Sequence, residues 1–170
     1  IGHAGVAGES DTVRIGGAQT RAFIAGIRGR TTAQSNAVAV LIDSAGQLGT
    51  ISSSRRVKQD VDDMGVRTRG LFDLRPVTFR YISHAEAGST ALEYGLIAEE
   101  VAEVYPDLVV RNAAGEIETV QYHKLAPMLL NEVQRLERER AALEQRVAQQ
   151  ARELDELKDR VNRLVSGSRR

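Results

Sequence analysis

The stretch LLNEVQRLERERAALEQRVAQQARELDELKDRVNRL, residues 129–164, decides the fold. Its apolar side chains recur at alternating spacings of three and four residues through about five heptads, a pattern typical of a coiled coil. So narrow an apolar stripe has nothing to pack on within a single helix, and the chain is therefore predicted to associate. The predicted seam has Leu129, Leu136, Leu143, Gln150, Leu157 and Leu164 at d and Val133, Arg140, Val147, Leu154 and Val161 at a.

The number of helices in this coiled coil is left open by the heptads. Val at a with Leu at d favours two strands in parallel coiled coils. Arg140 and Gln150 interrupt the seam and are expected to fix its register at some cost in stability. Side chains at g and at the following e face each other between helices, and their signs here are mixed: Glu153 attracts Lys158, whereas Glu132 repels Glu137 and Glu139 repels Glu144.

The chain before this helix divides into two parts. Residues 1 to about 54 are rich in Gly, Ala, Ser and Thr, with short β-type runs at 12–15, 22–27 and 37–42 that glycine-containing turns separate. The last of these runs is predicted to form a hairpin with residues 48–51. Runs this short bury little in a monomer, so this part is interpreted as a stalk that needs neighbours or sister chains to close a core.

Residues 55 to about 122 are expected to be compact and mixed. The spacing of Val57, Val61 and Met64 predicts a helix over 57–64 that Gly65 ends. The remaining predicted elements are strands at 76–82 and 92–97, an acidic helix at 98–104, a hairpin of strands 108–110 and 117–120, and the long helix from Tyr122 to about Val165, with Gly167 past its end.

The sequence thus predicts an α+β chain in three parts. These are an N-terminal glycine-rich β stalk over residues 1–52, a small mixed α/β region over 53–122, and a C-terminal helix over 123–170 that forms a parallel coiled coil.

Composition argues against several classes of function. Lys plus Arg and Asp plus Glu are equal at 23 each, so the net charge gives no general attraction to nucleic acid or to an anionic membrane. No apolar run approaches the roughly 18 residues of a membrane span. His3, His84 and His123 are scattered without metal-ligand spacing, and the chain has no Cys, so no metal site is predicted. No nucleotide-binding glycine motif is present, and no cofactor is implied.

Four blocks of sequence, in order, carry a family resemblance. They are SSSRRVKQDV at 52–61, LFDLRPVTFRY at 71–81, YGLIAEEV at 94–101 with YPDLV at 105–109, and VQYHKLAPMLL at 120–130. Together, over residues 53 to about 135, they resemble the C-terminal intramolecular chaperone and self-cleaving (S74-type peptidase) domain that trimerises phage tail spikes, tail fibres and related bacterial surface fibres.

The resemblance implies a homotrimer that drives the folding of an upstream β-fibre of the same polypeptide and then cuts itself off. The family uses a serine and a lysine five residues on, which here are Ser53 and Lys58, with the scissile bond between Ser52 and Ser53. Residues 1–52 then match the end of the fibre. The implied location is a virion tail fibre or spike, or a bacterial cell surface, with the chaperone part released after cleavage.

The chemistry of such a pair depends on its surroundings. A serine hydroxyl is a poor nucleophile until a base removes its proton, and a lysine is that base only when neutral. Burial, or the nearby Arg55 and Arg56, would favour the neutral amine. If Ser53 opens a strand-to-helix turn anchored by Val57 and Val61, Lys58 lies little more than one turn along and its side chain folds back. Backbone N–H groups near the helix start are the natural oxyanion donors.

One position departs from the family's pattern. Ser54 stands where the family commonly has Asp, and loss of that carboxylate would alter the turn or the electrostatics of the lysine. Ser52 and Ser54 are alternative nucleophiles. The alternative function is a structural trimerisation tip that never cuts.

Overall fold

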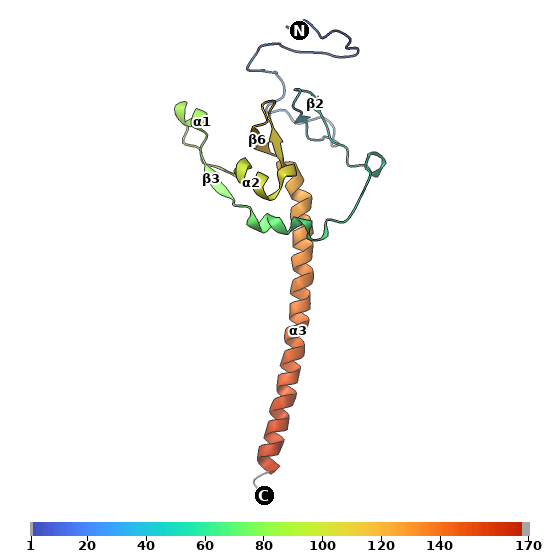
Figure 1. Ribbon diagram of the computed structural model, residues 1–170, viewed down its shortest axis with the longest axis vertical. Coiled ribbons are helices and arrows are strands. Elements are labelled where there is room, and N and C mark those ends of the chain that lie inside the picture. The colour runs from blue at the N-terminus through green and yellow to red at the C-terminus, as the bar shows by residue number, and fades with distance from the viewer. Residues whose placement is uncertain (1, 168–170) are drawn as a thin grey trace. The chain divides into compact units, whose positions relative to one another are not determined.

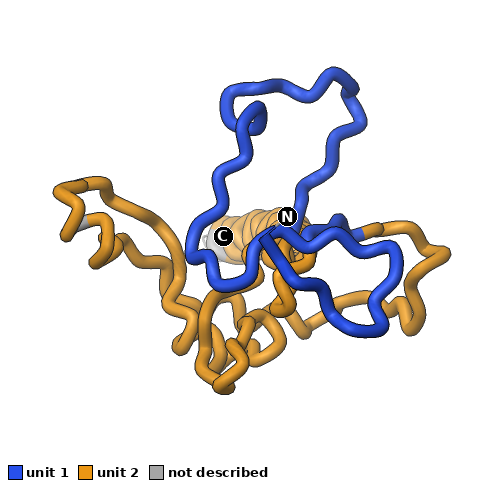
Figure 2. Tube along the Cα trace, turned by 90° about the horizontal axis from the view of Figure 1, so that it is seen from above, with its two compact units in different colours: residues 1–41, 48–51 blue, residues 42–47, 52–170 orange. Residues whose placement is uncertain are grey.

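The computed structural model describes residues 2–167 and divides into two compact units, which Figure 2 distinguishes by colour. Unit 1 comprises residues 1–41 and 48–51, and unit 2 comprises residues 42–47 and 52–170.

Unit 1 contains almost no regular structure. Strands β1 (Leu41–Ile42) and β2 (Leu48–Gly49) pair with each other, which confirms the predicted hairpin in shortened form. The strands predicted at 12–15 and 22–27 are not formed in the single chain, and none of the described residues 2–40 is buried. The physical reason is that a short run whose N–H and C=O groups find no partner strand, and whose side chains find no apolar surface, gains nothing from becoming extended.

Unit 2 holds the remaining elements in the predicted order (Figure 1). The antiparallel pair of β3 with β4, helix α2, and the antiparallel pair of β5 with β6 confirm the predicted strands and the acidic helix. The strand predicted at 76–82 is shorter than expected, because α1 begins at Ile82. The bounds are β3 Val77–Phe79, α1 Ile82–Glu86, β4 Glu93–Gly95, α2 Ala98–Val104, β5 Val109–Arg111, β6 Ile117–Val120 and α3 Leu125–Gly167.

The helix predicted over residues 57–64 is wrong. A one-turn 3-10 helix, η1 (Arg55–Val57), comes before that range, and a longer one, η2 (Gly65–Asp73), follows it. Asp60, in the middle of that range, adopts a left-handed backbone angle, with φ of 51°, which a continuous right-handed helix cannot contain. Val57 and Val61 are 67% and 55% exposed and anchor nothing within the chain.

The core of unit 2 lies between α2 and the β5–β6 hairpin. Its buried members are Val101, Leu108, Val109 and Val120, and the first turn of α3 contributes partly buried side chains to its edge. Element η2 is held against the end of α2 by a close approach at Gly70, where a Cβ would lie 2.9 Å from the Tyr105 hydroxyl.

A second close approach fixes where the long helix begins. The backbone N–H of Leu96 donates to the Tyr122 hydroxyl at 2.9 Å, and a Cβ on Gly95 would lie 2.7 Å from the same oxygen. Tyr122 opens the 3-10 turn η4 (Tyr122–Lys124), which continues into α3. The β4 strand therefore sets the starting point of the long helix through one tyrosine.

Helix α3 confirms the predicted long helix and is the longest element of unit 2 (Figure 1). It runs through Gly167, whereas the sequence predicted that it ends before that residue, at about Val165. The apolar seam side chains are all exposed in the single chain: Leu129, Val133, Leu136, Leu143, Val147, Leu154, Leu157, Val161 and Leu164. The coiled coil that would cover them stays a prediction.

Candidate functional site

The two residues that the sequence selected for catalysis lie in contact. Lys58 Nζ donates a hydrogen bond to Ser53 Oγ at 2.9 Å. The one turn of η1 separates the two residues, and Lys58 follows it in an extended conformation, with its backbone N–H bonded to the Arg55 carbonyl at 3.2 Å. The lysine side chain thus reaches back to the serine from the far end of a single turn.

The neighbouring serines are engaged differently. Ser54 is the N-cap of η1, where its hydroxyl accepts from the backbone N–H of Arg56 at 3.4 Å and from Arg56 Nε at 3.2 Å. Ser52 Oγ accepts from the backbone N–H of Ser54 at 3.2 Å. Of the three hydroxyls, the one facing an amine is that of Ser53, so the geometry favours it as nucleophile over Ser52 and Ser54.

The surroundings of the pair are open in the single chain. Ser53, Arg55, Arg56 and Lys58 are all exposed, so the nearby cations are in place but the burial that would favour a neutral lysine is not. The backbone N–H of Arg55 makes no hydrogen bond within residues 2–167, which leaves a donor free at the start of η1.

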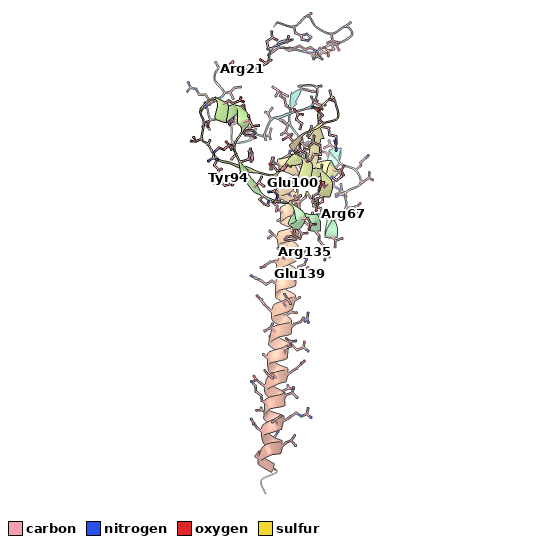
Figure 3. All side chains as sticks on the ribbon, turned by 60° about the vertical axis from the view of Figure 1, so that its left-hand side comes forward. Arg21, Arg67, Tyr94, Glu100, Arg135 and Glu139 are labelled. Atoms are coloured by element: carbon pink, nitrogen blue, oxygen red, sulfur yellow. The ribbon has the colours of Figure 1, made fainter. Side chains whose placement is uncertain are left out.

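A cluster that the sequence did not predict joins η2 to α3. Thr68 Oγ1 donates to Glu132 Oε1 at 2.6 Å, Arg135 Nε donates to Glu132 Oε2 at 2.7 Å, and Asn131 Nδ2 donates to the Gly65 carbonyl at 2.9 Å. We call these five residues the η2–α3 clamp. Figure 3 labels Arg135 on the helix beside η2.

Glu132 is the centre of this clamp and is only 4% exposed. The hydrogen bond from Arg135, and then that from Thr68, hold the pKa of the Glu132 carboxyl below its ordinary value. The heptad assigned this residue to an interhelical g position, and no sequence signal pointed to its burial, because the contact with Thr68 spans 64 residues.

The repulsion predicted between g and e glutamates of neighbouring helices stays a prediction, but the same glutamates have partners within one helix. Each of the four has an arginine partner on its own helix, since Arg135 lies between Glu132 and Glu139, and Arg140 lies between Glu137 and Glu144. The sequence interpretation considered only pairs between helices, whereas residues three and four apart on one helix are also neighbours. Arg140, although at an a position, is thereby paired with two carboxylates.

An apolar groove lies between the β3–β4 pair, the end of η2 and the start of α3. Its lining comes from three of the four sequence blocks, which converge in space here. The lining residues are Leu71, Leu74, Pro76, Val77, Thr78, Tyr94, Gly95, Leu96, Tyr122, Leu125 and Leu129.

The part of the chain that the structure describes holds neither a group of side chains suited to a metal ion nor a helix suited to span a membrane. Among residues 2–167, no three His, Cys, Asp or Glu side chains gather in a way that could hold a metal ion. No helix in the same range combines the length and the apolar character that crossing a bilayer requires.

Comparison with known proteins finds a family match. Residues 53–110 match the model of the peptidase S74 family, described as the chaperone of endosialidase. The matched segment begins at Ser53 and ends within β5, so it includes the Ser53–Lys58 pair, η2 and the β3–β4 pair. No curated protein matches the chain.

Proposed function

We propose that residues 53–110, which match the peptidase S74 family, form a self-releasing folding chaperone together with α3. It assembles as a homotrimer, folds an upstream β-fibre of the same polypeptide, and then cuts the bond between Ser52 and Ser53. The observation that carries the proposal is the 2.9 Å contact between Lys58 Nζ and Ser53 Oγ, at the residue where the family match begins.

The reaction follows from the position of the nucleophile. Ser53 Oγ and the Ser52 carbonyl carbon flank the same peptide bond, so attack closes a five-membered ring. Neutral Lys58 takes the hydroxyl proton, Oγ bonds to the carbonyl carbon, and the C–N bond breaks as the lysine returns the proton to the departing amine. The product is an ester between the Ser52 carbonyl and Ser53 Oγ. Water hydrolyses this ester to a Ser52 carboxylate and a new N-terminal Ser53.

Oxyanion stabilisation would come from the backbone. The developing negative charge lies on the Ser52 carbonyl oxygen, next to the start of η1. The free N–H of Arg55 is a suitable donor, and the side chains of Arg55 and Arg56 add positive charge nearby.

Assembly would supply the burial that the site lacks in one chain. Val57 flanks Lys58 directly, Val61 lies four residues after Val57, and both are exposed. A sister chain that covered these two valines would also exclude water from the amine, and desolvation favours the neutral form of lysine. Cleavage would thereby wait for a completed trimer. The exposed α3 seam supports association, and the family supplies the number three.

Variants of the pair test the mechanism. Ser53→Ala is expected to abolish cleavage and leave the trimer intact, because the hydroxyl attacks but packs against nothing. Lys58→Ala is expected to do the same, and Lys58→Arg is expected not to rescue, since a guanidinium stays protonated. Each variant is refolded, and the ratio of full-length to shortened chain is followed by denaturing electrophoresis at increasing pH. The unmodified chain is expected to cut faster as the pH rises, and undiminished cutting by Ser53→Ala would refute the mechanism.

The second candidate is a structural trimerisation tip that does not cut, and the residue favouring it is Ser54. Ser54 caps η1 as an aspartate would, but it brings no negative charge to the turn. If the unmodified chain stays whole, Ser54→Asp is expected to restore cutting. A chain that stays whole with this substitution is a structural tip.

A further inference from the structure

The apolar groove continues the coiled-coil seam. In the heptad register of α3, the groove residues Leu125 and Leu129 occupy g and d. On the same turn, Met128 packs against the buried core, so the docked face of the helix and its seam face lie side by side. Leu129 therefore belongs both to the groove lining and to the seam along which a parallel neighbour would lie.

The residue at e completes the pattern. Leu130 is 57% exposed and, within residues 2–167, is not among the apolar side chains that pack against the core. In a parallel coiled coil, g of one helix faces the following e of its neighbour. The Leu125 of one copy thus faces Leu130 of the next. Each of the later g–e pairs of α3, from 132–137 to 160–165, includes at least one charged residue. This first pair is wholly apolar and has an apolar groove on its g side.

From this register we infer that the groove is an interface between copies of this chain, in which Leu130 of one copy is seated in the groove of the next. The inference rests on the proposed assembly and deepens it, because it couples the coiled coil to the S74 domain. The groove walls come from η2, β3 and β4, so a neighbouring helix would bury the chaperone domain of one copy and not only its helix. Folding of that domain and assembly of the helices would then support each other.

Single cysteines test this seating, because the chain has no cysteine of its own. Tyr94→Cys labels an exposed position on the groove wall, and Leu130→Cys labels the proposed occupant. The two variants, one carrying a tag that changes its mass, are refolded together and treated with a short bismaleimide. A crosslinked product that contains one tagged and one untagged chain can only form between two copies, not within one. Gln134→Cys replaces Leu130→Cys as the matched control, since it lies one turn along α3 at an outward b position.

The expected result is a mixed crosslinked product for Tyr94→Cys with Leu130→Cys and only background for Tyr94→Cys with Gln134→Cys. Leu143→Cys, at d, reports association separately through a disulfide between its own copies. If Leu143→Cys chains join and the Tyr94–Leu130 product is absent, the seating is wrong while association stands. If neither forms, both the seating and the proposed assembly fail.

A second variant checks the energetics. Leu130→Ser is expected to raise the concentration needed for half-assembly by about tenfold or more, because burying a leucine side chain contributes one to two decades of affinity. Gln134→Ser is expected to leave that concentration unchanged. Equal behaviour of the two variants would overturn the inference.

Discussion

At the scale of single residues, some side-chain contacts could be expected from the sequence and others could not. The contact between Ser53 and Lys58 could be expected because the family resemblance selected both residues, five apart in one short block, and a local turn is enough to join them. The burial of Glu132 could not, because it depends on Thr68 from a distant part of the chain. A short-range contact can be expected from one block of sequence, whereas a buried carboxylate is defined only by the tertiary contact that buries it.

Glu132 leads to a prediction on acid stability. Its pKa is lower in the folded chain than its ordinary value of 4.5, so its clamp contributes fully above that value. The contribution is lost as the pH falls through the lower pKa of the folded state. Glu132→Gln is expected to lower the melting temperature at neutral pH and to flatten its decline below about pH 4.5. Thermal melts at one fixed protein concentration measure this, because assembly also affects the melting temperature.

The control for this variant is Glu156→Gln, which removes an exposed carboxylate from the same helix. It is expected to melt as the unmodified chain does at every pH. If Glu132→Gln also keeps the original acid dependence, the clamp does not contribute to acid sensitivity.

At the scale of elements, helix and strand periodicity predicted the paired strands, α2 and α3 of unit 2, but not η2, α1 or the segment after the Ser53–Lys58 pair. The acidic helix α2 and the β5–β6 hairpin were predictable because their side-chain spacing and turn residues agree. The helix expected over 57–64 was not formed, because Val57 and Val61 have the spacing of a helix face but no surface within the chain to pack on. Apolar spacing thus predicted a helix at a place where its two valines stay exposed within residues 2–167.

The seam of α3 gives an element-scale prediction. Leu143→Asp is expected to prevent assembly and, with it, cleavage, because a carboxylate in a dry seam costs several kcal/mol per chain with no partner available. Val147→Asp is expected to behave alike. Analytical ultracentrifugation at micromolar concentration reports assembly, and the unmodified chain is expected to sediment as a trimer.

The matched control is Ala142→Asp, which places the same charge on the neighbouring, outward c position. It is expected to assemble and to cut. A Leu143→Asp chain that is monomeric and still cuts efficiently would show that the site is complete within one chain, contrary to the proposed dependence on assembly.

At the scale of the whole molecule, the chain carries more apolar surface than it can cover alone. The apolar side chains of the α3 seam, Val57 and Val61 are exposed, the groove lining is exposed or half-buried, and unit 1 buries none of its described residues. The sequence predicted association from the heptads and the short glycine-separated runs, and this association stays a prediction. It could not predict that the runs at 12–15 and 22–27 form no strands in one chain, because spacing within a run does not show whether a partner strand forms beside it.

Unit 1 gives a prediction at this scale. Residues 1–52, prepared alone, are expected to show no cooperative thermal transition by circular dichroism, because they bury too little apolar surface to offset the entropy of ordering the backbone. A sharp, reversible melting transition of the isolated segment would mean that the stalk has a core of its own.

The central claim is that the assembled chain cuts itself between Ser52 and Ser53. The most direct measurement is N-terminal sequencing and intact mass of the products after the unmodified chain is refolded. The account predicts two fragments, one ending at Ser52 and the other beginning with Ser53 and sedimenting as a trimer. A product beginning at Ser54 or Arg55 would move the nucleophile, and a chain that stays whole at every pH and concentration, with Ser54→Asp as well as without it, would contradict the claim.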